Sequence, residues 1–255
     1  MHPRETVDRA LRLSAQGLSD RQIAGVCGVS AGAVRKWRTG DRRARDDPRS
    51  SGSCVRCARN PLPPRPPGIY AYLLGLYLGD GHVVHHRRGV YRLMISCSAS
   101  WPGLVEAAAQ AMAAVLPSAV GLLRRPGCVV VNSYSKHWPH LLPQHGPGKK
   151  HHRPIVLEPW QEHIADVFPG DLVRGLMHSD GYRGLNRVRR HFNGRDHWYE
   201  YPRYLFKNES ADILRICGEA LDRLGVAWRH SKRNEISVAR REAVALLDCH
   251  VGPKT

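Results

Sequence analysis

The sequence contains one short pattern twice, and this repetition constrains the fold more than any other feature. The segment "IYAYLLGLYLGDGH" runs from Ile69 to His82, and "DLVRGLMHSDGY" runs from Asp171 to Tyr182. Each is an apolar stretch of helical length that ends in an aspartate followed by glycine. The two acids are Asp80 and Asp180. Such a repeat predicts a chain built from two related halves.

Both helices carry small residues at corresponding positions. Gly75 and Gly79 stand four residues apart in the first copy, and Gly175 and Ser179 do so in the second. Small residues at this spacing produce a flat helix face on which another backbone can lie closely. We expect the two helices to pack face to face in the same direction, which would bring both aspartates together.

Two carboxylates at neighbouring helix C-termini are electrostatically unfavourable. The end of a helix carries partial negative charge, and close carboxylates repel each other. A divalent cation removes both penalties, and hard carboxylate oxygens suit Mg²⁺. The alternative is that Asp80 and Asp180 are surface residues that cap turns before glycine. The presence of two copies favours the metal hypothesis.

The segments after each acid also repeat. Alternating patterns predict two strands, a helix, two more strands and a final helix in each half. The predicted strands are 82–86, 90–98, 119–125 and 128–135, then 182–192, 200–208, 226–232 and 235–240. The predicted helices are 104–116 and 137–142, then 212–224 and 241–250. The fold class is therefore α+β, with two pseudo-symmetric αββαββα halves (69–158 and 159–255) that each contain an antiparallel sheet.

The chain is strongly basic, with a formal net charge of +17 over 255 residues. A basic protein of this size most often binds a polyanion, usually nucleic acid. The alternative is a basic ribosomal or membrane-surface protein. Arginines recur along the predicted strands, so we expect a sheet with one apolar face and one cationic face that lies along a duplex. These arginines are Arg187, Arg189, Arg203, Arg229 and Arg233.

Lysine follows a similar Gly-Pro sequence near the end of each half. "QHGPGKKHHRPI" contains Lys149 and Lys150, and "CHVGPKT" contains Lys254. A lysine that returns near each carboxylate can orient water or stabilise negative charge on a phosphate. A basic surface loop that touches the DNA backbone explains the same residues equally well.

The first 42 residues predict a separate helix-turn-helix domain. Residues 6–16 have helical periodicity, Ser19 caps a second helix, Gly28 allows a turn, and Ser30 caps a third helix over 31–38. The small residues Ser30, Ala31 and Gly32 can approach base edges, whereas Arg35, Lys36 and Arg38 are placed for phosphates or guanine. A three-helix packing module is the alternative, and the cationic face favours DNA.

Residues 43–68 are rich in arginine and proline and predict a linker. This segment contains Cys54 and Cys57 in a CxxC pattern, which is half of a zinc site. The incidental interpretation is favoured over bound zinc.

Seven cysteines, no signal peptide and no membrane-length apolar run predict a reduced, soluble, cytoplasmic protein associated with the nucleoid.

The two motifs resemble the signature of the LAGLIDADG homing endonucleases. The likeness lies in "LLGLYLGDG" (73–81) and "VRGLMHSDG" (173–181), with "YLFKNES" (204–210) as further support. It implies a monomer that acts as a pseudo-dimer, with two saddle-shaped sheets over double-stranded DNA. It also implies that each acid binds Mg²⁺ (or Mn²⁺) with help from the carbonyl of Gly79 or Ser179. The family's lysine corresponds best to Lys149 or Lys150, and to Lys254.

The resemblance and the retained acids favour a site-specific DNA endonuclease that hydrolyses phosphodiesters, with one aspartate for each strand and no small-molecule substrate. The first alternative is a non-cleaving DNA-binding regulator on the same scaffold. The second is an RNA-binding maturase. Arg174 and His178 make the second motif more polar, so if one site is weak, we expect it to be the one at Asp180.

Overall fold

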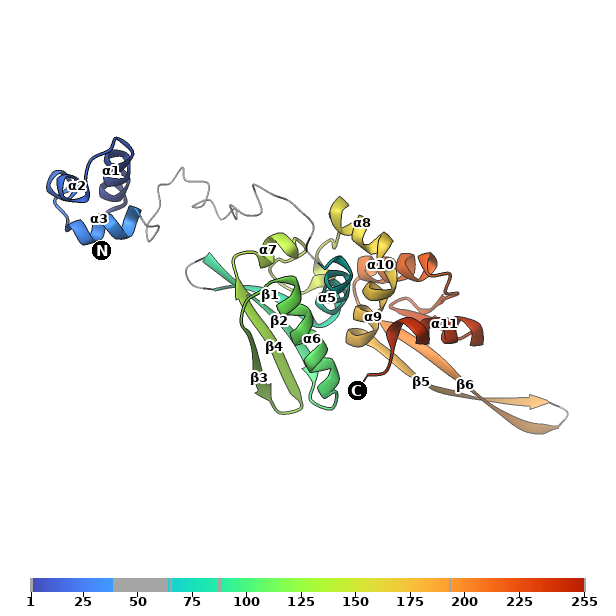
Figure 1. Cartoon of the computed structure of the whole chain (residues 1–255). Coiled ribbons are helices and arrows are strands. Elements are labelled where there is room, and N and C mark those ends of the chain that lie inside the picture. The colour runs from blue at the N-terminus through green and yellow to red at the C-terminus, as the bar shows by residue number, and fades with distance from the viewer. Residues whose placement is uncertain (1, 39–63, 65, 87–88, 193, 255) are drawn as a thin grey trace. The chain divides into compact units, whose positions relative to one another are not determined.

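The computed structural model describes residues 2–38, 64, 66–86, 89–192 and 194–254 (Figure 1). Internal contacts divide the chain into two units, residues 1–62 and 63–255. Cys54 and Cys57, together with most of the predicted linker, lie outside the described residues.

The first unit contains three short helices, α1 (Arg4–Ala15), α2 (Asp20–Cys27) and α3 (Ala31–Arg38). Ser19 caps α2 in a capping box: its backbone N–H donates to Gln22 Oε1 (2.9 Å), and its Oγ accepts from the Gln22 N–H (3.4 Å). Gly28 ends α2 at φ 65°, a left-handed conformation that favours glycine. The helices enclose a small core of Val7, Ala10, Ile23, Val34 and Trp37.

The second unit repeats one arrangement of elements, as the sequence predicts. The first half contains α5 (Pro67–Asp80), β1 (Gly81–His86), β2 (Val90–Ser98), α6 (Pro102–Val115), β3 (Val120–Arg125), β4 (Cys128–Ser135) and α7 (Trp138–Leu141). The second contains α9 (Pro169–Asp180), β5 (Gly181–Phe192), β6 (Arg195–Lys207), α10 (Ala211–Arg223), β7 (Arg229–Lys232), β8 (Glu235–Val238) and α11 (Arg241–Val251). A helix that the sequence analysis did not predict, α8 (Pro159–Val167), precedes α9.

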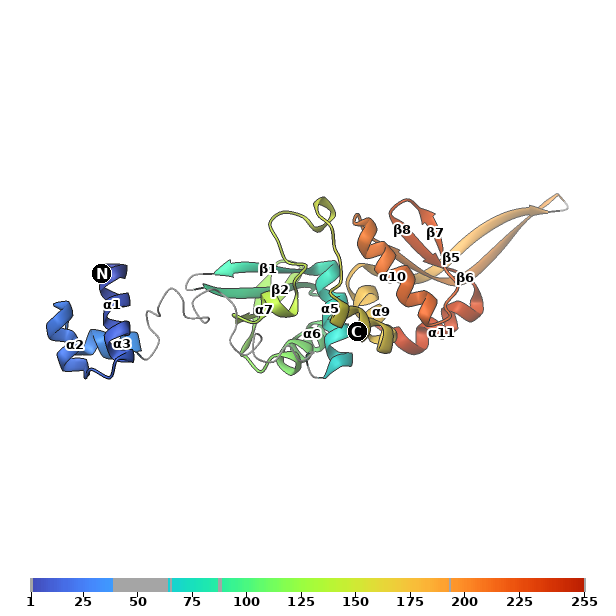
Figure 2. The same cartoon turned by 90° about the horizontal axis from the view of Figure 1, so that it is seen from above.

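Each half forms one four-stranded antiparallel sheet. The strand orders are β1-β2-β4-β3 and β5-β6-β8-β7, so the two sheets have the same topology. Helices α5 and α9 lie between the two sheets (Figures 1 and 2). The α+β fold with two related halves is therefore confirmed.

Strands β5 and β6 form a longer hairpin than predicted. They pair from Gly181↔Phe206 to Phe192↔Arg195, but β8 pairs with β6 only over Tyr204–Lys207. The remainder projects past the sheet as a two-stranded ribbon (Figure 1). The predicted second strand began at residue 200, because residues 195–199 are all exposed and lack the alternation of a half-buried strand.

The core of the second unit is centred on α5. Its residues from Tyr70 to Leu78 are all buried, so the helix is apolar on every side. Helix α9 packs against it with very close backbone contact. A Cβ atom built on Gly75 would lie 2.5 Å from the carbonyl oxygen of Leu172 and 2.8 Å from the Cα of Gly175. Only glycine fits at this crossing.

Candidate active site and nucleic-acid interface

Helices α5 and α9 run in the same direction, and their last residues are Asp80 and Asp180. Residues at matching heights face each other: Gly68 lies near Asp171, Gly75 near Gly175 and Gly79 near Ser179. A Cβ on Gly79 would lie 3.1 Å from Asp180 Oδ2. The acid of one helix therefore lies against the residue that precedes the acid of the other.

The electrostatics of this pair match the expected strain. Burial and the negative charge of Asp180 raise the pKa of Asp80 to about 6, although part of the side chain contacts water. Burial also raises the pKa of Asp180. A cation beside the two acids would relieve their repulsion.

A lysine lies at the C-terminal end of each helix. Lys150 Nζ donates to the carbonyls of Tyr77, Leu78 (3.1 Å) and Gly79 (3.0 Å), which lie in the last turn of α5. Lys254 Nζ donates to the carbonyl of Gly181, directly after Asp180, at 2.6 Å. Lys149 is exposed and lines the adjacent cavity. The structure thus places Lys150, rather than Lys149, at the end of α5.

Residues from both halves line one cavity at the site. A cavity of about 500 Å³ is lined by Gly79 and Lys150 from the first half and by Asp180 from the second. Burial lowers the pKa of Lys150 to about 8, and of the two acids Asp180 opposes this more strongly. Burial also lowers the pKa of Lys254, where Asp80 is the stronger of the two opposing acids. Each lysine therefore interacts more strongly with the acid of the other half than with the acid of its own half.

Asn208 is a site residue that the sequence analysis did not identify. Its Nδ2 donates to Asp180 Oδ2 at 2.7 Å, which stabilises the ionised acid. The strand registers Gly81↔Ile95 and Gly181↔Phe206 place Cys97 at the equivalent position in the first half. Burial and then Asp80 raise the pKa of Cys97 to about 12, so it remains a neutral thiol. The hydrogen bond from Asn208 thus favours the ionised form of Asp180, and the neutral Cys97 thiol gives Asp80 no equivalent support. This difference is opposite to the expectation from the sequence that the site at Asp180 is the weaker one.

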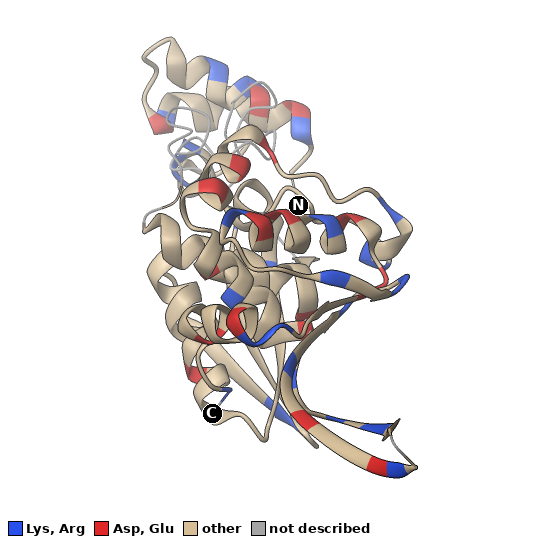
Figure 3. Cartoon of the chain, turned by 90° about the vertical axis from the view of Figure 1, so that its right-hand side faces the viewer, with Lys and Arg blue, Asp and Glu red and all other residues tan. Residues whose placement is uncertain are grey.

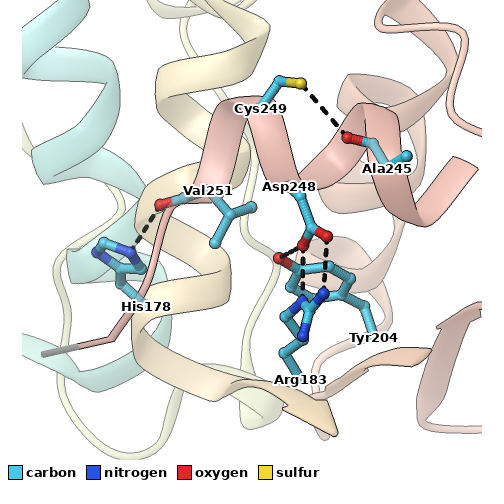
Figure 4. Close-up of polar contacts among 7 residues, drawn as sticks. All are labelled: His178, Arg183, Tyr204, Ala245, Asp248, Cys249 and Val251. Atoms are coloured by element: carbon cyan, nitrogen blue, oxygen red, sulfur yellow. Dashed lines mark hydrogen bonds and ion pairs between the residues drawn. The ribbon is translucent and has the colours of Figure 1, made fainter. Parts of the chain in front are cut away.

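The polar residues of the second motif are integrated into the helix pair. His178 is only 4% exposed, and its Nδ1 lies 3.0 Å from the Tyr72 hydroxyl of α5. Its Nε2 lies 3.0 Å from the Val251 carbonyl at the end of α11 (Figure 4). Arg174 places its guanidinium 4.9 Å above the Tyr72 ring. These side chains therefore do not separate the two helices.

The strand register divides the predicted arginines between two faces. Residues directly opposite in an antiparallel pair share a face, and successive residues alternate. Arg187 and Arg189 share the face of Tyr204 and Phe206, which are buried under the helices. Arg203 and Arg229 lie on the opposite, open face. The expectation of one cationic face carrying all these arginines was wrong.

Arg233 also differs from its prediction. It lies in the turn between β7 and β8 rather than on a strand, because β7 ends at Lys232. Its side chain is exposed, and its guanidinium is 3.9 Å from Glu209.

The hairpin segregates its charges by face. Both of its acids, Asp196 and Glu200, lie on the face of Arg187 and Arg189, where Arg189 is 3.3 Å from Asp196 and Arg187 is 3.4 Å from Glu200. The open face contains no acid among its described residues. Figure 3 shows the basic residues in blue and the acidic residues in red along the hairpin. It carries Asn186, Arg190, Phe192, Arg195, His197, Tyr199, Tyr201 and Arg203. Cations and aromatic rings without acids suit a nucleic-acid surface.

Helix α3 of the first unit exposes the predicted cationic residues. Ser30 Oγ accepts from the Ala33 N–H (3.2 Å) and caps the helix. Gly32, Arg35, Lys36 and Arg38 are exposed, whereas Ala31 is half-buried. Arg38 and Arg35 lie 3.3 and 3.7 Å from Asp20 of α2, which draws both side chains toward that helix.

The described residues form no cluster of three or more His, Cys, Asp or Glu side chains placed for a metal. A cation at the paired acids would therefore need backbone oxygens or water as further ligands. No helix in the described part of the chain is long and apolar enough to cross a membrane.

Two kinds of similarity to known proteins were found. Residues 9–41 match the family model of a homeodomain-like domain, HTH_23. The chain is similar in structure to the homing endonuclease I-DmoI in complex with DNA and Mn, with 16% identity and a TM-score of 0.47 over 74% of this chain and 99% of that one. It is also similar to the N-terminal LAGLIDADG domain of DUF199/WhiA, with 12% identity and a TM-score of 0.45 over 74% and 83%. No curated protein matches the chain in sequence.

Proposed function

We propose that the protein is a site-specific double-strand DNA endonuclease of the homing type. The single observation that carries this proposal is the pairing of Asp80 and Asp180 at adjacent helix C-termini, with Lys150 and Lys254 bonded to backbone carbonyls beside the two acids. The motif resemblance to LAGLIDADG enzymes supports the same conclusion. Two such centres suit a duplex, because its two strands run antiparallel and each needs its own site.

The residues present fit a hard divalent cation. Asp80 and Asp180, with the backbone carbonyls of Gly79 and Ser179, would hold Mg²⁺ or Mn²⁺, since their oxygens are the ligands that such ions prefer. The bound cation would supply Lewis-acid activation of the phosphate and of a water molecule. Lys150 and Lys254 would stabilise negative charge that develops on the phosphate oxygens.

DNA binding would use both units. The open face of the β5–β6 hairpin would contact the duplex through Arg190, Arg195 and Arg203. Helix α3 would enter a second groove, which the match to a homeodomain-like domain supports. Because phosphate contacts release counterions, binding should weaken steeply with salt.

A non-cleaving DNA-binding regulator is the second candidate, and one observation favours it. Lys150 Nζ already donates to the Gly79 carbonyl, which is one of the proposed metal ligands. Two acids and two lysines also balance in charge without a metal. A site of this kind could stabilise the helix pair alone.

Selection of bound sequences from a randomised duplex library, followed by incubation with Mg²⁺ or Mn²⁺, separates the two candidates. The endonuclease proposal expects double-strand cleavage of the selected site. Asp80→Asn and Asp180→Asn should retain binding and lose cleavage, whereas Asp166→Asn, at an exposed position of α8, should behave as wild type. If the wild-type protein binds its site tightly but never nicks it with either cation, the regulator candidate is correct.

A further inference from the structure

We propose that His178 is a positioning residue that holds Lys254 beside the acids, so that its loss impairs cleavage of one strand selectively. This proposal rests on the proposed function. The geometry points to His178 because it is the side chain that joins both motif helices to the segment carrying Lys254.

The segment after α11 needs an anchor. Helix α11 ends at Val251, and Gly252 and Pro253 then lead to Lys254. Gly252 has φ 68°, and its N–H is 3.4 Å from the Asp248 carbonyl, a long hydrogen bond. The Val251 carbonyl is one of the last groups of a helix, which have no partner within the helix itself. His178 supplies that partner at 3.0 Å (Figure 4).

One tautomer of His178 satisfies both of its contacts. The Tyr72 hydroxyl donates to Nδ1, and the Nε2–H donates to the Val251 carbonyl. Tyr72 belongs to α5, His178 to α9 and Val251 to α11. The imidazole therefore fixes the beginning of the lysine segment against both motif helices, three residues before Lys254.

The first half anchors its lysine by a different residue. Leu78 occupies the motif position of His178, two residues before the acid, and it has no group that can donate. The Lys150 loop is instead held by Arg153, whose guanidinium donates to the carbonyls of Gln144 (3.1 Å), Pro147 (3.2 Å) and Gly148 (3.1 Å). The two lysines thus have independent anchors, and a change in one should not affect the other.

Selective loss should appear in the products of cleavage. In His178→Leu, which copies the first motif, the Val251 carbonyl loses its donor and Lys254 is held less firmly. Removal of one charge-stabilising donor costs roughly 10²–10³-fold in rate. Because Lys254 is loosened and not removed, cleavage of one strand should slow about tenfold. The other strand should keep its rate, and nicked duplex should accumulate.

The test follows each strand with its own end label in wild type, His178→Leu, His178→Gln and Arg153→Leu. Glutamine retains a donor and an acceptor and should restore most of the rate. Arg153→Leu should slow the opposite strand. Equal slowing of both strands by His178→Leu, or no change in the strand ratio, would overturn the proposal. If His178→Leu fails to fold, His178→Met, which also lacks a donor but has a flexible side chain that adapts to the core, is judged by the same criterion.

Hydrogen exchange gives a readout that does not depend on cleavage. Without DNA, His178→Leu should speed exchange in residues 252–254 and leave residues 144–153 unchanged, whereas Arg153→Leu should do the reverse. If no variant cleaves DNA but this pattern holds, the proposed function fails and the anchoring role stands. Unchanged exchange at 252–254 refutes the anchoring role even in an active enzyme.

Discussion

Replacement of Gly75 by alanine tests the packing on which the candidate site depends. The added Cβ would meet three backbone atoms of α9: the Leu172 carbonyl oxygen at 2.5 Å, the Leu176 nitrogen at 2.7 Å and the Gly175 Cα at 2.8 Å. Ordinary contact begins near 3.4 Å, so the closest approach is too short by 3.4 − 2.5 = 0.9 Å. Because no rotatable side chain can yield, the helices themselves must move apart.

The expected cost follows from this displacement. Overpacking of a well-packed core costs about 1–3 kcal/mol. Alanine in place of glycine within a helix returns about 0.5–1 kcal/mol. For a unit of this size, a net loss of about 1–2 kcal/mol lowers the Tm by roughly 2–8 °C. The cleavage rate should fall by more than the loss of folded protein accounts for, because the same movement separates Asp80 from Asp180.

Differential scanning calorimetry of the full chain is the assay, with Gly25→Ala as the matched control. Gly25 is also helical, but an added Cβ there meets no atom within 4 Å. That change should leave the second unit unaffected and slightly stabilise the first. If Gly75→Ala melts the second unit at the wild-type temperature or above, the inferred close contact of α5 and α9 is wrong.

Three further predictions concern the acids and the hairpin. Asn208→Ala removes the amide donor to Asp180, so the Mg²⁺ concentration for half-maximal cleavage should rise about tenfold, measured by metal titration. Arg190→Gln, on the open face, should weaken DNA binding and flatten its salt dependence more than Arg187→Gln does, because the guanidinium of Arg187 is 3.4 Å from Glu200. Fluorescence anisotropy at a series of salt concentrations compares the two variants. The pKa of Asp80 is raised from 3.8 to about 6 on folding, so its contribution to stability without metal should fall as pH rises through that window. Urea titrations at pH 4 and pH 7 measure the difference in unfolding free energy between wild type and Asp80→Asn. This difference should change by about 1 kcal/mol between the two pH values, after allowance for solvent screening. A difference that stays constant would contradict the prediction.

Much of the fold could be predicted because its signals are local. Helical periodicity with Ser19 and Gly28 identified the first unit, and the apolar motif helices with Gly75 and Gly175 identified the second. Strand alternation located most strands, since half-buried strands alternate polar and apolar residues. The exposed end of β6 lacked that signal, and its length was underestimated.

Local sequence alone determined that two apolar helices end in Asp80 and Asp180 and can approach closely, because helix periodicity and small side chains act within a few residues. The tertiary structure decided which lysine reaches the end of α5 and which arginines lie on the open face. It also decided that Asn208 contacts Asp180 and that His178 contacts Val251. A shift of one residue in strand register moves every side chain to the other face, so a face follows only from the final pairing. Lys150 and Gly79 are brought together over a separation of 71 residues. Such contacts depend on how whole elements pack, which no short pattern encodes.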